Sequence, residues 1–145
     1  MTTLCTASAV STAPPGAFFA RWADMDTWPE WDEAIAWTRL DGPFAAGSTG
    51  TLKPKGGPKV SFVIETLEPD SEFTDVSSMP GAKLRIRHLV AVQDDDRTRV
   101  DIAVSIDGPL GWLWGRILGK GIAASTPDGL RHLVAMAEAD AASDG

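Results

Sequence analysis

The most constraining feature of this sequence is a series of strand-like segments joined by links too short to contain a helix. From residue 34 to about residue 108, apolar and polar residues alternate with the period that marks a half-buried strand. Clusters rich in Gly, Pro, Asp and Ser interrupt the alternation and mark turns. With one more strand near the N-terminus, the expected strands are residues 2–11, 35–40, 51–54, 59–67, 72–78, 83–92 and 99–106. Parallel neighbours need a crossover of about a dozen residues or more, so the strands after residue 34 are expected to pair antiparallel.

Helical spacing replaces the strand pattern in two places. Phe18, Trp22 and Met25 follow a proline-rich start and predict a short helix over about residues 14–24, followed by a turn or single helical turn at 26–32. After residue 108, apolar residues recur at i, i+3 and i+4, which predicts a long C-terminal helix.

The C-terminal helix is expected to be kinked or broken near residues 125–129. There Thr126, Pro127 and Asp128 form a helix-start signal in the middle of the apolar stripe. Proline also lacks the backbone N–H that a helix interior needs. The expected fold class is α+β: a seven-stranded antiparallel curved sheet wrapped around a long kinked helix, with a short helix pair after the first strand.

Length and charge narrow the function classes. A chain of 145 residues fits one domain, so residues 1–145 are expected to form a single ligand-binding domain. The net charge of −7 argues against a nucleic-acid partner and equally against docking on anionic membranes. We also expect no stable membrane insertion, because charged residues interrupt the apolar stretches before they are long enough to span a bilayer.

Few residues of the chain are suited to metal or cofactor chemistry. Cys5 is the sole cysteine, and His88 and His132 are the only histidines, so the chain offers a poor set of zinc ligands. No phosphate loop, G-x-S-x-G or H-E-x-x-H pattern occurs. We therefore expect no metal and no cofactor. The N-terminus lacks the basic start and unbroken apolar run of a signal peptide, so a cytoplasmic location is expected.

One residue departs from the strand pattern of residues 83–92, "KLRIRHLVAV". His88 shares a face with the aliphatic residues Leu84, Ile86, Val90 and Val92, which should be buried. The opposite face carries Lys83, Arg85 and Arg87, which we expect to form cross-strand ion pairs with Asp101 and Asp107.

The partner of His88 depends on the hairpin register. A two-residue turn at Pro80-Gly81 pairs Met79 with Ala82, Asp75 with Ile86, and Phe73 with His88. Asp75 and His88 then lie diagonally on one face, where a carboxylate would fix the imidazole tautomer and favour its charged form. A three-residue loop would instead put them on opposite faces. On the first register they form a candidate acid/base or ligand-orienting pair; the alternative is a buried histidine satisfied by a backbone group or water.

Four stretches carry a resemblance to a known superfamily. They are "TAPPGAFFARWADMDTWPEWD" (12–32), "LDGPFAAGSTGTLKPK" (40–55), "FTDVSSMPGAKLRIRH" (73–88) and "SIDGPLGWLWGRILGKG" (105–121). In this order they resemble the helix-grip superfamily of birch-pollen-allergen-like and START-like domains. Within that superfamily they look most like the bacterial polyketide cyclase/dehydrase and lipid-transport branch. The resemblance implies a deep apolar cavity between the sheet and the C-terminal helix, with the glycine-rich hairpin at 47–57 as a mobile rim.

Two functions are compatible with such a cavity. The first is binding or transport of a small hydrophobic ligand, such as a lipid, polyketide or aromatic compound. The second is a polyketide cyclase or dehydratase that uses Asp75 and His88 as its catalytic pair. Whether the chain is an enzyme, and whether it forms a homodimer, stays open. The candidate ligand-binding residues are Phe62, Phe73, Ile86, Ile102, Trp112, Leu113 and Ile117.

Overall fold

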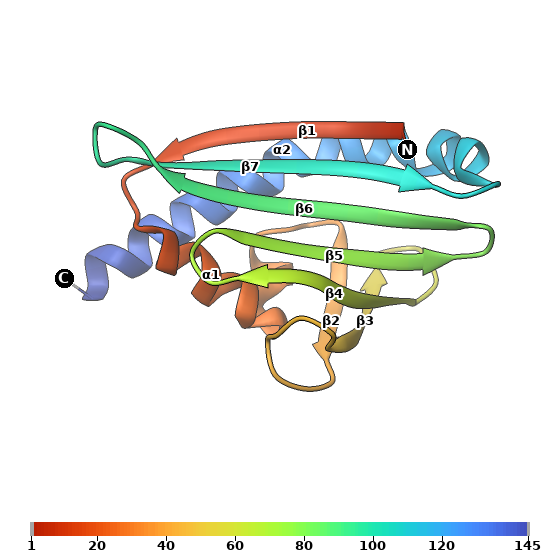
Figure 1. The fold of residues 1–145 in the computed structure, drawn as a ribbon, viewed down its shortest axis with the longest axis horizontal. Coiled ribbons are helices and arrows are strands. Elements are labelled where there is room, and N and C mark those ends of the chain that lie inside the picture. The colour runs from red at the N-terminus through yellow and green to blue at the C-terminus, as the bar shows by residue number, and fades with distance from the viewer. Residues whose placement is uncertain (1, 145) are drawn as a thin grey trace.

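Seven antiparallel strands form one curved sheet in the computed structural model, which describes residues 2–144. The strands are β1 (Thr2–Ser11), β2 (Ile35–Leu40), β3 (Thr49–Pro54), β4 (Val60–Glu68), β5 (Glu72–Met79), β6 (Ala82–Val92) and β7 (Thr98–Asp107). Their order across the sheet is β1-β7-β6-β5-β4-β3-β2. Consecutive strands are therefore neighbours, except that β1 pairs with β7 at the far edge (Figure 1).

The strands confirm the sequence prediction to within about two residues at each end. All pairs are antiparallel, as the short links require. The β5–β6 hairpin also has the predicted register, in which Phe73 lies opposite His88 and Asp75 opposite Ile86. Its two-residue turn includes Gly81 with a φ of 72°, a conformation that glycine adopts without steric cost.

The helices are α1 (Pro15–Ala23), the 3-10 helix η1 (Met25–Glu30) and α2 (Gly111–Asp144). Of the kink or break expected near residues 125–129, the break is wrong, because α2 is continuous and contains Pro127 in its interior. The start signal at Thr126 is overridden by the apolar stripe on either side of it. Leu130 and Leu133 are buried beyond the proline, so ending the helix there would expose them.

The inner face of the sheet is packed at one end and open at the other. At the packed end, α1 and η1 bury Phe18, Trp22 and Trp28 against the sheet, and the C-terminal half of α2 adds Leu130 and Leu133. The apolar phase of β7 is buried as predicted, over Val100, Ile102, Val104 and Ile106. The N-terminal half of α2 buries less of its surface, and residues 112–124 are all half-buried or exposed.

Two of the candidate ligand-binding residues on α2 are exposed. Leu113 is 38% exposed and Ile117 is 60% exposed. The helix turns Trp114 and Leu118 toward the sheet side in their place. An apolar stripe wider than one helix face allows this rotation, so spacing alone did not identify the inward side.

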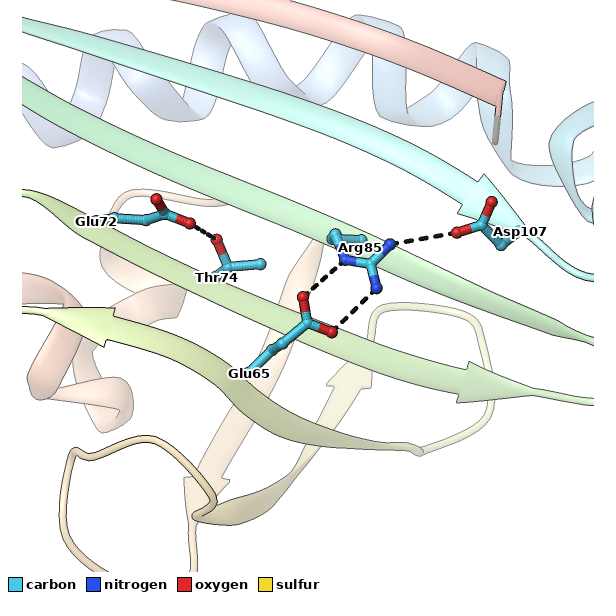
Figure 2. Close-up of polar contacts among 5 residues, drawn as sticks. All are labelled: Glu65, Glu72, Thr74, Arg85 and Asp107. Carbon is cyan, nitrogen blue, oxygen red and sulfur yellow. Dashed lines mark hydrogen bonds and ion pairs between the residues drawn. The ribbon is translucent and has the colours of Figure 1, made fainter.

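The outer face of the sheet carries ion pairs between strands. Arg85 on β6 reaches Glu65 on β4 at 3.0 Å and Asp107 on β7 at 3.2 Å (Figure 2). The predicted pairing with Asp107 is thus confirmed, whereas Asp101 bonds Arg99 of its own strand. Arg85, and also Arg87 through Glu72 of β5, are therefore paired on the outer surface of the sheet.

Candidate functional site

A cavity of about 840 Å³ lies between the inner face of the sheet and the N-terminal half of α2. Its walls are mostly aliphatic and aromatic side chains from β4, β6, β7, η1 and α2. The volume falls within the range of about 300–1,000 Å³ found for small-molecule sites. The fold leaves this space because α1 and η1 fill only the other end of the curved sheet.

The carboxyl group of Asp75 lies in this apolar wall. On β5, Asp75 sits between Ile64 of β4 and Ile86 of β6, its direct partners in the two neighbouring strands. Burial raises the pKa of Asp75 to about 7, because a charged carboxylate is poorly solvated there. Within residues 2–144, no hydrogen bond or ion pair to this carboxyl is found. Its bonding capacity is therefore directed at the cavity that it lines.

His88 is buried on β6 and lines the same cavity. Its Nδ1 lies 2.8 Å from the carbonyl oxygen of Phe73. A carbonyl only accepts, so Nδ1 carries the proton and Nε2 of the neutral ring is left as an acceptor. Burial lowers the pKa of His88 to about 4, against the opposing effect of that hydrogen bond. The imidazole is therefore neutral at physiological pH.

Two aromatic rings hold the imidazole in place. The ring of Phe73 stacks on His88 with centroids 4.6 Å apart and planes 14° apart. Trp22 of α1 lies on it at a tilt, with centroids 5.0 Å apart. His88 is thus fixed in both position and tautomer before any ligand arrives.

One part of the predicted pairing of Asp75 and His88 is wrong. The register does bring both side chains to one cavity. No hydrogen bond or ion pair between them is found in the described part of the chain. The tautomer is fixed by the Phe73 carbonyl, and burial keeps the imidazole neutral, where a nearby carboxylate was expected to favour its charge. The two groups are separate polar points in one apolar cavity.

The structure separates the predicted ligand-binding residues into two groups. Phe62, Ile86, Ile102 and Ile117 line the cavity. Phe73, Trp112 and Leu113 lie outside its lining. Phe73 is fully buried behind His88, and the other two are exposed on α2, whereas Trp114, on another side of the same helical turn, faces the cavity.

Several lining residues are not among the predicted ligand-binding residues. Trp22, Trp28 and Trp31 border the cavity from α1, η1 and the residue that follows. Ser77 lines it from β5, and Trp114 closes the far side, where its Nε1 donates to the Pro80 carbonyl at 2.8 Å. Ser77 could have been found, because it shares the strand phase of Asp75. The tryptophans could not, since only the packing of α1 and η1 against the sheet brings them there.

The opening of the cavity lies between the hairpin linking β3 and β4 and the first turns of α2. Lys55, Gly57 and Lys59 border it from the hairpin, and Ile117 borders it from the helix. The glycine-rich hairpin thus occupies the position that the resemblance implied. No group of three or more His, Cys, Asp or Glu residues suited to a metal ion occurs in residues 2–144. In the same range, no helix is long and apolar enough to cross a membrane.

Comparison with known proteins gives one family match. The family described as polyketide cyclase/dehydrase and lipid transport matches residues 2–138, nearly the whole chain. None of the curated proteins compared with this sequence matches it significantly.

Solved structures with the same fold are distant in sequence. Hypothetical protein jhp0584 from Helicobacter pylori has 14% identity and a TM-score of 0.74, over 92% of this chain and 86% of that one. The di-domain ARO/CYC StfQ from the steffimycin biosynthetic pathway has 12% identity and a TM-score of 0.70, over 97% of this chain and 52% of that one. Ara h 8.0201 has 14% identity and a TM-score of 0.61, over 88% and 95% respectively. At these identities the likeness concerns the fold alone.

Proposed function

This chain belongs to the polyketide cyclase/dehydrase and lipid transport family, and we propose that it binds a small, mostly apolar ligand in the cavity under α2. The observation that carries the proposal is the combination of that cavity with two buried polar groups in its lining, Asp75 and His88. The apolar wall supplies affinity through burial, and the two polar groups restrict the orientation of the guest.

The polar groups also define which ligand groups fit. The Nε2 atom of neutral His88 accepts a hydrogen bond, so it favours a hydroxyl or another donor. Asp75 donates a hydrogen bond when protonated and accepts when ionised, and with a pKa of about 7 both forms occur near neutral pH. A ligand with a carbonyl and a hydroxyl near each other satisfies both groups, whereas a pure hydrocarbon leaves two buried polar groups without partners.

A second candidate function is enolisation of a carbonyl compound, as a cyclase or dehydratase requires. The same geometry favours it, because a protonated Asp75 and an unprotonated His88 Nε2 face one water-poor space. Nε2 would take a proton from the carbon next to the carbonyl, and Asp75 would give its proton to the developing enolate oxygen. This chemistry also fits the name of StfQ, the di-domain ARO/CYC of the steffimycin biosynthetic pathway.

Mass spectrometry of organic extracts from the purified protein tests the binding proposal. A retained small apolar compound, present in the parent and depleted in His88→Leu, is the expected result. His132→Leu is the matched control, because that histidine is exposed and lies outside the cavity lining. If extracts of the parent and of His88→Leu are alike, Asp75 and His88 do not select the ligand.

Turnover assays separate the two candidates. A β-keto compound that is consumed by the parent and spared by Asp75→Asn would favour the enzyme. Stoichiometric binding without conversion, measured with the same compound, would favour the carrier.

A further inference from the structure

The N-terminal half of α2 presents an unusual exposed surface beside the cavity opening. Trp112 and Ile117 are 64% and 60% exposed, and Leu113 is 38% exposed. At 3.6 residues per turn, Arg116 and Lys120 lie among these three on one outward arc of the helix. This arc, residues 112, 113, 116, 117 and 120, is called the outer arc below. The outer arc carries both bulky apolar side chains and cations.

The charge of the chain is distributed unevenly around this opening. The two segments that form it, residues 42–64 and 108–127, contain Lys53, Lys55, Lys59, Arg116 and Lys120 and no acidic residue. The rest of the chain holds the other eight cations and all twenty acids. A chain with a net charge of −7 therefore has a basic rim around its cavity.

None of these cations has an acidic residue within its own segment. Lys55 and Lys59 are exposed on the hairpin, while the ammonium of Lys53 is bound by the carbonyls of Pro54 and Gly57. Asp32 lines the cavity on the side of η1, and Glu33 and Asp128 border a smaller hollow together with Gly121 of α2. These acids lie at the η1 end of the opening, next to the C-terminal end of the outer arc.

We propose that the outer arc and the hairpin at residues 55–59 dock peripherally on an anionic lipid bilayer. Trp112, Leu113 and Ile117 would enter the boundary between headgroups and acyl chains, where the amphipathic indole is favoured. Arg116, Lys120, Lys55 and Lys59 would lie against lipid phosphates.

The arrangement fits a lipid surface better than a second copy of the chain. A symmetric dimer through the outer arc would place Arg116 and Lys120 of one copy near the same cations of the other. A bilayer meets the cations with negative charge and the apolar groups with acyl chains at the same time. Because Ile117 belongs both to the outer arc and to the cavity lining, docking would bring the cavity opening to the lipid. An apolar guest would then enter without crossing water.

The net charge of −7 is a sum over the whole chain. A membrane senses only the surface within about one Debye length, roughly 8 Å at physiological salt. All twenty acids that make the net charge negative lie outside the two rim segments.

Vesicle flotation tests the proposal directly. The probes are vesicles of phosphatidylcholine alone and of phosphatidylcholine mixed with phosphatidylglycerol at about three to one. The parent should float with the mixed vesicles and not with the neutral ones, and added salt should release it. The pairs Trp112→Ser with Ile117→Ser and Arg116→Glu with Lys120→Glu should each lower the partition coefficient at least about tenfold.

The matched control lies on the hairpin between β6 and β7, at the opposite end of the sheet from the start of α2 (Figure 1). Val92 is 59% exposed and Arg97 is also exposed, so Val92→Ser with Arg97→Glu removes comparable groups elsewhere. It should float like the parent, as should Asp75→Asn, which changes only the cavity. Failure of the parent to bind mixed vesicles at low salt would overturn the proposal and leave an acidic protein as the partner of this rim. Equal loss in the control would overturn it as well.

Discussion

The Nδ1 atom of His88 lies 2.8 Å from the carbonyl oxygen of Phe73, its direct partner across the β5–β6 pair. This contact fixes the imidazole as a neutral ring whose free nitrogen, Nε2, has only an acceptor role. His88 thus has a hydrogen-bond partner at Nδ1, and its Nε2 remains available to accept a hydrogen bond from a ligand. The predictions below follow from this arrangement and from the packing around it.

Replacing His88 with leucine should leave the fold intact and weaken ligand binding. The change removes one hydrogen bond, worth about 0.5–1.5 kcal/mol, and adds apolar burial of similar size. Thermal melts should therefore shift by only a few degrees, while titration with an apolar ligand bearing a hydroxyl should show a loss of about tenfold. An unfolded variant, or unchanged affinity, would mean that His88 serves the structure alone.

The pH dependence of stability should contain two opposing contributions. The pKa of Asp75 is raised from 3.8 to about 7, so its proton is bound more tightly in the fold and stability is lost as pH rises through this window. The pKa of His88 is lowered from 6.5 to about 4, so its contribution is present above pH 6.5 and is lost as pH falls. Between about pH 4 and 6.5 the two slopes cancel in the parent.

Single substitutions should reveal each contribution with opposite sign. As pH rises from 4 to 7, the unfolding free energy of Asp75→Asn should increase by about 4 kcal/mol relative to that of the parent. As pH rises from 4 to 6.5, the unfolding free energy of His88→Leu should decrease by about 3 kcal/mol relative to that of the parent. Urea unfolding at several pH values measures both differences. Parallel curves for all three proteins would show that neither group is desolvated in the fold.

Truncation of aliphatic residues on the buried inner face of the sheet should be costly, and more so for a residue that does not line the cavity. Ile102→Ala should lose about 2–3 kcal/mol, at the low end for buried aliphatics, because its side chain borders a space that already exists. Ile64→Ala should lose about 3–5 kcal/mol, since Ile64 is fully buried and outside the lining. Val92→Ala is the exposed control and should change stability by less than about 0.5 kcal/mol. A loss that small at Ile102 would contradict the assigned phase of β7.

Two glycines should respond oppositely to alanine. A Cβ on Gly50 of β3 would collide with the Arg39 carbonyl and with the ring of Phe62, so Gly50→Ala should cost about 1–3 kcal/mol and push Phe62 into the cavity. Gly119 in α2 has open space around its Cβ position, so Gly119→Ala should stabilise by up to about 1 kcal/mol. Chemical denaturation compares the two, and a ligand titration of Gly50→Ala should show reduced affinity. Equal effects on stability would mean that strand β3 does not approach β2 and Phe62 this closely.

Much of the fold follows from short-range features of the sequence. The alternation in residues 83–92 predicted the buried face, and a two-residue turn at Pro80-Gly81 predicted which residue faces which, because strand period and hairpin register are set by neighbours in the chain. The observed register excludes the three-residue loop that the sequence also allowed. The same register predicted that Asp75 and His88 share a face. The rotation of α2 could not be derived in this way, because apolar residues occur around most of its N-terminal half, and its interior proline was tolerated only because Leu130 and Leu133 pack beyond it.

The sequence by itself therefore determined the strands, their pairing and the apolar phase on which His88 lies. Tertiary structure alone decided the chemical state of the site. Burial under α1 and α2 sets the protonation of Asp75 and His88, since the cost of a charge depends on everything packed around it. Folding also gathered five cations from two distant segments around one opening, a grouping that the net charge of the chain conceals. Local patterns specify local geometry, whereas electrostatics and cavities depend on residues that only the fold brings together.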